Sequence, residues 1–379
     1  MRYRNMCLFV ATILAAASAV CAGEASASPP IITIRKGAAD LQNASVVTGF
    51  TDISTGSLAS GRTEVALAFD EANLFIAFKC YSPVPPKATV KERDGQVWED
   101  DAVEVFLDPT DSRSDYYQFI GNAAGAMWDS RGRDGSWNAK WEYAATVEKG
   151  FWTATFKIPF AALGVKAPAD GATWGLNLCR DQQTPVKEIS SWAIVEDGFH
   201  NPGQFGHLLF DRKGAAVRIL SVGSAGAGFI AEIEAGQNPV EFNAVLRTVG
   251  ATQASPLQAK RIEPGAKEKI EITQKISTPG SYSLAWGVKD MKTGKMVSSG
   301  EERFKVLEPL SVSLRKYFLS GLRGVDVSEA GLEKAPGMSA RVEIGKPGAP
   351  PAVTASITEF DQKRSGSASL NVYKVPPGD

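Results

Sequence analysis

Short apolar runs separated by turn residues recur along the chain, and the spacing typical of helices is scarce. Thr63–Phe69 and Leu74–Tyr81 flank the polar stretch Asp70–Asn73, a pattern that predicts a β-hairpin. Similar patterns predict further strands at Ala102–Asp108, Tyr116–Asn122, Glu142–Val147, Phe151–Ile158, Trp174–Arg180, Ser190–Ile194 and Gly206–Phe210, with a short helical turn at Ala161–Gly164. Many short strands spaced about 8–12 residues apart favour an antiparallel sandwich or barrel.

The strand pattern continues after residue 213, where tryptophan becomes rare. Strands are predicted at Phe229–Glu234, Val240–Arg247, Glu268–Gln274, Ser281–Val288 and Glu302–Val306. This spacing is typical of an immunoglobulin- or fibronectin-like sandwich, which we expect over residues 215–308. Residues 309–379 contain strand patterns at Leu310–Leu314 and Ala340–Ile344. We therefore predict an all-β protein: an antiparallel sandwich over residues 31–213, a second, smaller β-sandwich, and a partial or irregular C-terminal β segment.

The N-terminal residues have the pattern of a secretory signal peptide. Arginines at positions 2 and 4 precede the apolar stretch Cys7–Val20, which is too short to span a bilayer comfortably. Cleavage is expected after Ala22, or as late as Ala27, so residues 1–22 form the predicted signal peptide. We expect a secreted or periplasmic protein without membrane insertion, because no later apolar segment is long enough to cross a bilayer.

The cysteines leave two alternatives open. A lipid anchor on Cys21 competes with simple cleavage, although Val20 stands where a lipoprotein signal normally has a small residue. After cleavage Cys80 and Cys179 remain. An oxidising compartment would permit a disulfide between them. Two buried free thiols are an equally good interpretation.

Charge and composition exclude several classes of function. Lys and Arg total 41 against 42 Asp and Glu, so the chain lacks the cationic surplus with which nucleic-acid binders neutralise phosphates. Two histidines, His200 and His207, and four cysteines are too few for a histidine- or cysteine-based metal centre in the body of the chain. No cofactor is required by anything in the sequence.

Seven of the eight tryptophans lie between positions 98 and 192. Three of them lie in strand patterns and are predicted core residues: Trp152, Trp174 and Trp192. Three others surround a polar, turn-rich loop from which one could reach a binding groove: Trp128, Trp137 and Trp141. The seventh, Trp98, opens the most informative stretch of the sequence.

That stretch runs from Trp98 to Pro109 and combines an acidic turn with an alternating strand. Alternation directs three apolar side chains toward the core: Val103, Val105 and Leu107. Asp100, Glu104 and Phe106 take the opposite face. An aromatic plate beside carboxylates suits a sugar, because C–H groups pack on indole and carboxylates accept hydrogen bonds from hydroxyl groups. An ordinary strand entered by a solvated acidic turn is the alternative.

The same stretch resembles the signature of family-nine carbohydrate-binding modules, in which a Trp precedes an acidic pair and a Val-Glu-Val-Phe-x-Asp strand. The resemblance continues in order through Tyr116–Asn122, Trp174–Asn177, Ser190–Trp192 and Asn201–Gly206. It covers about residues 31–212. It implies a β-sandwich that binds oligo- or polysaccharides without catalysis and is usually attached to a glycan-degrading catalytic domain.

Carried over by position, the resemblance implies Trp98 as a stacking plate, Glu104 as a hydroxyl acceptor and Asn122 as an amide ligand. Gln118, Ile120 and Asn122 share one face by alternation, so this transfer is geometrically coherent. The carbohydrate-binding set also includes Gln118.

Two positions depart from the family pattern. Phe199, with His200 beside it, stands where the family has a second stacking Trp, and both are included in the predicted set. Ile120 stands where the family has Arg. A phenyl ring offers less stacking area and isoleucine cannot donate a hydrogen bond, so we expect binding that is weaker, altered in specificity or lost.

Structural calcium is a further implication of the resemblance. Asp108, Asp111 and Asp115 are spaced so that one loop could turn oxygen ligands onto a hard cation. Aspartates are also common turn formers, so a purely structural loop is the alternative.

The leading interpretation is an exported, non-catalytic carbohydrate-binding protein that serves polysaccharide catabolism, alone or as part of a larger enzyme. The first alternative is a glycoside hydrolase acting on O-glycosyl bonds, with Asp100, Asp101 and Glu104 as candidate acids. These acids crowd one strand entry, whereas catalytic carboxylates face each other across a cleft. The second alternative is a surface scaffold or adhesion protein whose sugar site has degenerated.

Overall fold

A computed structural model describes residues 29–37, 44–222, 228–249, 251, 253–273, 276, 278 and 280–306, and the backbone of five strands between residues 310 and 371. The predicted signal peptide and Cys21 lie outside the described residues. Within the described part of the chain, no helix has the length and apolar character needed to cross a membrane.

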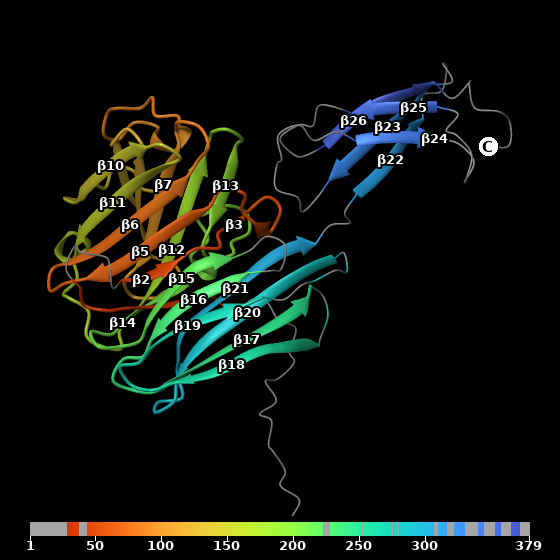
Figure 1. The fold of residues 1–379 in the computed structure, drawn as a ribbon. Coiled ribbons are helices and arrows are strands. Elements are labelled where there is room, and N and C mark those ends of the chain that lie inside the picture. The colour runs from red at the N-terminus through yellow and green to blue at the C-terminus, as the bar shows by residue number, and fades with distance from the viewer. Residues whose placement is uncertain are drawn as a thin grey trace, which may run out of the picture.

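Nearly all regular structure in the first half of the chain is β (Figure 1). The strands are β1 (Ile31–Ile34), β2 (Ser45–Val47), β3 (Thr51–Asp52), β4 (Ser57–Leu58), β5 (Thr63–Phe69), β6 (Asn73–Tyr81), β7 (Ala102–Asp108), β8 (Tyr117–Asn122), β9 (Met127–Arg131), β10 (Glu142–Glu148), β11 (Phe151–Pro159), β12 (Thr173–Gln182), β13 (Glu188–Ser191) and β14 (Gly206–Phe210). Short 3₁₀ turns are η2 (Val97–Glu99), η3 (Phe160–Leu163) and η4 (Pro202–Gln204). Each predicted strand overlaps an observed one, but β13 ends at Ser191 and shares only two residues with the predicted strand Ser190–Ile194. η3 is the predicted helical turn displaced by one residue.

The second half contributes longer strands. They are β15 (Ala216–Val222), β16 (Phe229–Glu234), β17 (Val240–Thr248), β18 (Ala254–Ile262), β19 (Lys267–Ile272), β20 (Gly280–Asp290) and β21 (Met296–Val306). Farther along are β22 (Leu310–Lys316), β23 (Leu322–Glu329), β24 (Ala340–Ile344), β25 (Val353–Ile357) and β26 (Ser365–Asn371). β23 pairs with both β22 and β26, and β24 pairs with β25, all antiparallel. The immunoglobulin-like assignment of residues 215–308 stays a prediction.

Two mixed sheets form the layers of the molecule. Sheet A has 13 strands and runs β18-β17-β20-β21-β1-β14-β12-β13-β3-β4, with β7, β8 and β9 branching from β12. Sheet B has eight strands in the order β10-β11-β6-β5-β2-β15-β16-β19. Most pairs are antiparallel, as predicted, but β1–β14 and β2–β15 are parallel. The sheets are therefore mixed.

Two hydrophobic cores lie between these sheets. The first contains the predicted core residues Trp152, Trp174 and Trp192, and Trp141 stacks on Phe156 within it at 5.5 Å between ring centroids. The second gathers around a group of large rings: Phe229, Phe242 and Trp286. Because β21 pairs with β1 and β15 pairs with β2, both sheets continue from the first core to the second.

The two described cysteines face different environments. Cys80 on β6 is part of the first core, whereas Cys179 on β12 packs on the other face of sheet A. Both are free and fully buried. Burial raises the pKa of the Cys80 thiol to about 11. The structure therefore agrees with the interpretation as buried thiols and not with a disulfide.

Candidate functional site

The outer face of sheet A, the side turned away from the first core, carries most of the predicted site residues. On β7, Val103, Val105 and Leu107 are core residues, as alternation predicts. Glu104 and Phe106 therefore point outward. Antiparallel pairing places Glu104 opposite Ile120 of β8 on one side and opposite Cys179 of β12 on the other.

Glu104 lies in a buried polar cluster. Gln118 Nε2 donates to Glu104 Oε2 at 2.6 Å, and the carboxyl groups of Glu104 and Asp181 are hydrogen-bonded to each other. All three side chains are 3–5% exposed. Burial, followed by the negative charge of Glu104, raises the pKa of Asp181 well above its usual value, and burial also raises the pKa of Glu104. Burial and the closeness of the two acids therefore both disfavour ionisation of Asp181.

The side-chain amide of Asn122 holds neighbouring loop segments in place through hydrogen bonds. Its Nδ2 donates to Asp100 Oδ2 and to the Val90 carbonyl, both at 2.9 Å. Its Oδ1 accepts from the backbone N–H groups of Ala124 and Ala126. The donors and the acceptor of this fully buried amide are in use. In this arrangement Asn122 contributes to a site by positioning neighbouring residues.

Asp100 fixes the backbone two residues after Trp98. It accepts hydrogen bonds from Thr89 N and Oγ1 and from Val90 N, each at 2.7 Å. Burial opposes ionisation, but these hydrogen bonds and the one from Asn122 hold the pKa of Asp100 below its usual value. The anchored carboxylate holds the end of η2, which carries Trp98, against sheet A.

Trp98 is the exposed aromatic group of this face. Trp98 is 40% exposed. Its ring contacts the Trp128 ring edge-to-face, with 5.5 Å between the ring centroids and 80° between the ring planes. Trp128 of β9 lies opposite Ile120 of β8, and Ile120 in turn lies opposite Glu104 of β7. Two strand spacings, about 10 Å, therefore separate the backbones that carry Trp128 and Glu104.

A second group of rings lies on the other side of Glu104. Phe106 contacts Phe199, His200, Tyr116 and Phe205, with centroid distances of 5.5–6.2 Å. His200 Nδ1 lies 2.7 Å from the Tyr116 hydroxyl, and burial lowers the pKa of His200. Phe199 is only 8% exposed, so its ring packs within the cluster and offers little open surface.

The N-terminal part of this sandwich matches a known protein family. Residues 37–213 match the family described as carbohydrate family 9 binding domain-like. This segment is a family 9-like domain. No curated protein matches the chain.

Similar solved structures cover about half of the chain. A Bacteroides uniformis protein that is described as a presumed carbohydrate binder shares 18% identity at a TM-score of 0.40, covering 48% of this chain and 97% of its own. A carbohydrate-binding module of family 9 from Caldicellulosiruptor kristjanssonii, in complex with cellotriose, shares 15% identity at a TM-score of 0.37, covering 48% of this chain and 93% of its own. The same module is also known in complex with glucose.

The three aspartates proposed for calcium do not converge in the family 9-like domain. Asp108 accepts hydrogen bonds from Thr110, Ser112 and Arg113 within its own turn. Asp111 pairs with Arg113 and His207, and Asp115 pairs with Arg131. Among the described residues, no group of three or more carboxylate, imidazole or thiol side chains is arranged to hold a metal ion. Asp108 therefore acts here as a turn former.

Sequence reasoning missed Asp181 and only partly identified Trp128. Asp181 follows the end of the predicted strand Trp174–Arg180, and alternation from Cys179 would have placed it on the outer face. Its contact with Glu104 depends on the pairing of β12 with β7, which no local pattern reveals. Of the three loop tryptophans, Trp128 joins Trp98, whereas Trp137 and Trp141 pack on the first core.

Proposed function

We propose that the family 9-like domain binds carbohydrate on the outer face of sheet A, with Trp98 as its stacking surface. The main observation behind this proposal is that Trp98 is 40% exposed while its ring packs edge-to-face against Trp128. The C–H face of a sugar ring packs on such a surface, and a ring that is already positioned loses little conformational entropy on binding. The family match supports the same function.

Glu104, Gln118 and Asp181 supply the polar part of the proposed site. Asp181 Oδ2 is buried and has no hydrogen-bond partner among the described residues. The small exposure of the cluster means that a ligand touches it at one point, so Trp98 should contribute more to affinity than Glu104.

The wider role that we propose is that of an exported binding protein in polysaccharide catabolism. The arginines and the apolar stretch at the N-terminus support export. Mass spectrometry of the mature protein from its native host tests this, because cleavage after Ala22 or Ala27 gives a defined new N-terminus. A mature chain that begins at Met1 would contradict export through this signal.

The geometry gives little support to catalysis by the same acids. Catalytic carboxylates of glycosidases stand about 5–9.5 Å apart so that a glycosidic bond fits between them. The carboxyl groups of Glu104 and Asp181 are instead hydrogen-bonded directly to each other. Release of reducing sugar by the purified chain, lost in Glu104→Gln, would favour the hydrolase instead.

The decisive experiment is calorimetric titration of the full chain with a panel of soluble oligosaccharides that includes glucose and cellotriose. We expect binding that Trp98→Ala weakens by about tenfold or more, since a stacking contact contributes about 1–2 kcal/mol. Val147→Ala, which shortens an apolar side chain of similar exposure on sheet B, is the control. If nothing in the panel binds, or both variants bind as the wild type does, this site assignment fails.

A further inference from the structure

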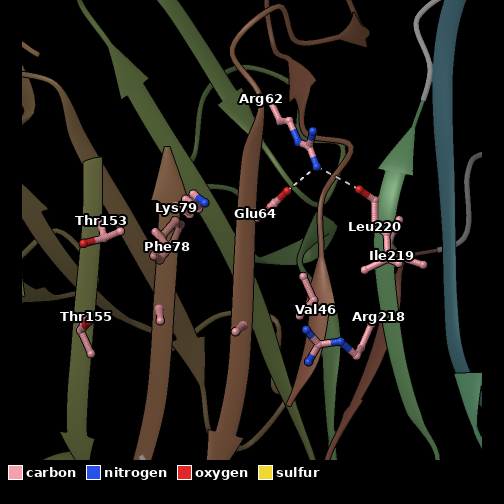
Figure 2. A pocket seen from close by; sticks show the side chains of 12 residues that line it. Val46, Arg62, Glu64, Phe78, Lys79, Thr153, Thr155, Arg218, Ile219 and Leu220 are labelled. Atoms are coloured by element: carbon pink, nitrogen blue, oxygen red, sulfur yellow. Dashed lines mark hydrogen bonds and ion pairs between the residues drawn. The ribbon is translucent and has the colours of Figure 1, made fainter. Parts of the chain in front are cut away.

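A groove lies on the outer face of sheet B, on the opposite side of the sandwich from Trp98. It has a volume of about 630 Å³ and crosses β11, β6, β5, β2 and β15. Figure 2 shows Thr153 and Thr155 on one side of this groove and Arg218 and Leu220 on the other. The groove thus extends from the family 9-like domain onto the first strand of the second half.

Strand register explains why the sheet is hollow here. Thr155, Ala77, Ala66, Val46 and Arg218 lie directly opposite one another across the five strands. The middle three side chains are small or short, whereas the strands at either side carry larger polar groups. A row with small residues at its centre leaves a trough that solvent or a ligand fills.

Cationic side chains dominate the polar lining. Arg62, Lys79 and Arg218 line the groove, against one acid, Glu64. Arg62 forms an ion pair with Glu64 and donates to the Leu220 carbonyl at 3.0 Å, as Figure 2 shows. The single carboxylate is therefore already neutralised, and the groove has a net positive charge.

Lys79 is the cation best placed for a ligand. Its ammonium lies 5.0 Å from the ring centre of Tyr81 and 4.3 Å from that of Phe151. Within the described part of the chain, no carboxylate lies within ion-pair distance of it. Glu64 lies directly opposite Lys79 across the β5–β6 pair, but its carboxylate pairs with Arg62. The Lys79 ammonium thus rests on aromatic rings and forms no ion pair within the described part of the chain. Cation–π contacts alone contribute about 0.5–1 kcal/mol at exposed sites, so a contact between the Lys79 ammonium and an anionic ligand group would be stronger.

The lining favours a saccharide over other polyanions. An extended peptide usually binds by adding to a free sheet edge, but every strand beneath this groove is paired on both sides. The near balance of 41 basic and 42 acidic residues disfavours nucleic acid. Threonine hydroxyls, a carboxylate and cations together offer the mixture of donors and acceptors that hydroxyl groups and acidic substituents require.

We propose that this groove is a second glycan-binding site, which takes an oligosaccharide carrying carboxylate or sulfate groups. Lys79 contacts an acidic substituent, and Thr153 and Thr155 contact neighbouring hydroxyl groups. The site is separate from the Trp98 face and does not depend on it.

The test is calorimetric titration of the full chain at about 0.15 M salt, where weak surface electrostatics are screened. The probes are oligogalacturonate, a sulfated oligosaccharide and neutral cellotriose. We expect an acidic probe to bind, and Lys79→Ala to weaken binding about tenfold through loss of a charge-assisted contact. Comparing the two acidic probes distinguishes carboxylate from sulfate recognition.

Three matched variants make the outcome decisive. Lys157→Ala removes a lysine from the outer face of β11 beyond the groove and should change affinity by less than about twofold. Ala77→Trp fills the trough without altering charge and should abolish binding while near-UV circular dichroism confirms folding. Trp98→Ala should bind the acidic probe normally. Absence of binding, equal losses in Lys79→Ala and Lys157→Ala, unchanged binding by Ala77→Trp, or equal binding of poly-glutamate would each overturn the proposal.

Discussion

The outer faces of the two sheets use one scaffold in opposite ways. On sheet A the outward positions of β7, β8 and β12 hold acids and amides that bond to one another, flanked by aromatic rings. On sheet B the outward positions of β5 and β6 hold the small residues Ala66 and Ala77 beside the acid Glu64 and the cation Lys79. Alternation gives each sheet one face free of the core, and the residue types at those positions decide whether that face is closed by its own contacts or stays open.

The largest effect is expected where the two layers are tied together. Arg180 projects from β12 of sheet A and donates to the carbonyls of Arg62 and Tyr81 and to Thr63 Oγ1, at 2.9–3.1 Å. Arg180→Met should lower the free energy of unfolding by about 3 kcal/mol, because buried acceptors lose their partner. It should also weaken binding in the groove, since Arg62 shifts.

Urea unfolding measures the stability change. Arg212→Met, which removes a partly exposed arginine paired with Asp170, is the control and should cost less than about 1 kcal/mol. A similar cost for both variants would mean that Arg180 does not couple the layers.

Next in size is a reciprocal test of the two faces. Trp98→Ala should reduce affinity for a neutral oligosaccharide about tenfold and leave the acidic probe unchanged, and Lys79→Ala should do the reverse. The double variant should show the sum of the two effects, because distant sites behave additively within about 0.5 kcal/mol. Strong coupling in this calorimetric cycle would indicate a single continuous site.

A smaller effect is expected in the pH dependence of stability. The pKa of Asp181 is raised well above 3.8 in the fold, so the folded protein retains a proton that the unfolded chain releases. Its stabilising contribution is full below the unfolded pKa and is lost as pH rises toward the folded pKa. Asp181→Asn keeps a donor for Glu104 and lacks this titration. Its stability relative to the wild type should therefore increase from about pH 5 to about pH 8.

Thermal or urea unfolding at several pH values checks this difference. Burial raises the pKa of Glu302 to about 8, which has the same sign, and subtracting the wild-type curve from the variant curve cancels that contribution. A difference that stays constant with pH would contradict a protonated Asp181.

The smallest effect concerns the loop for which the family resemblance implies calcium. Asp115 and Arg131 form an ion pair at 2.6 Å with both side chains about half exposed. Asp115→Ala should change stability by less than about 1 kcal/mol. We expect the same small change with calcium and with a chelator, measured by the thermal midpoint. A calcium-dependent loss of several degrees would show that the loop gathers around an ion.

Strand positions with a clear alternating pattern could be predicted well from the sequence. β7 and β14 begin and end where predicted because polar or turn-forming residues bound a short apolar run on both sides: Asp100-Asp101 and Asp108-Pro109 for β7, Pro202-Gly203 and Asp211 for β14. β3 and β4 have two residues each, too few for any period to appear. β18 contains Pro256 and lies at the edge of sheet A, where the lack of an N–H is tolerated, so its pattern looks like a loop.

The candidate site was predictable only where a single strand defines it. Trp98, Glu104, Gln118 and Asn122 follow from local patterns and the family resemblance. The Glu104–Asp181 contact requires the pairing of strands about seventy residues apart, and the use of Asn122 by Asp100 requires the path of the preceding loop. The groove on sheet B depends on the register of five strands, so no single segment of the sequence predicts it.

The continuity of both sheets has a practical consequence for dissecting this protein. β1 pairs with β14 and β21, and β2 pairs with β5 and β15. A truncation after residue 213 would remove β15 and β21 and leave β1 and β2 with unpaired backbone groups along one side. Exposed strand edges of this kind promote intermolecular pairing and aggregation. The family 9-like domain is therefore a poor candidate for transplantation as an isolated module, and an expression boundary after β21 preserves its neighbours.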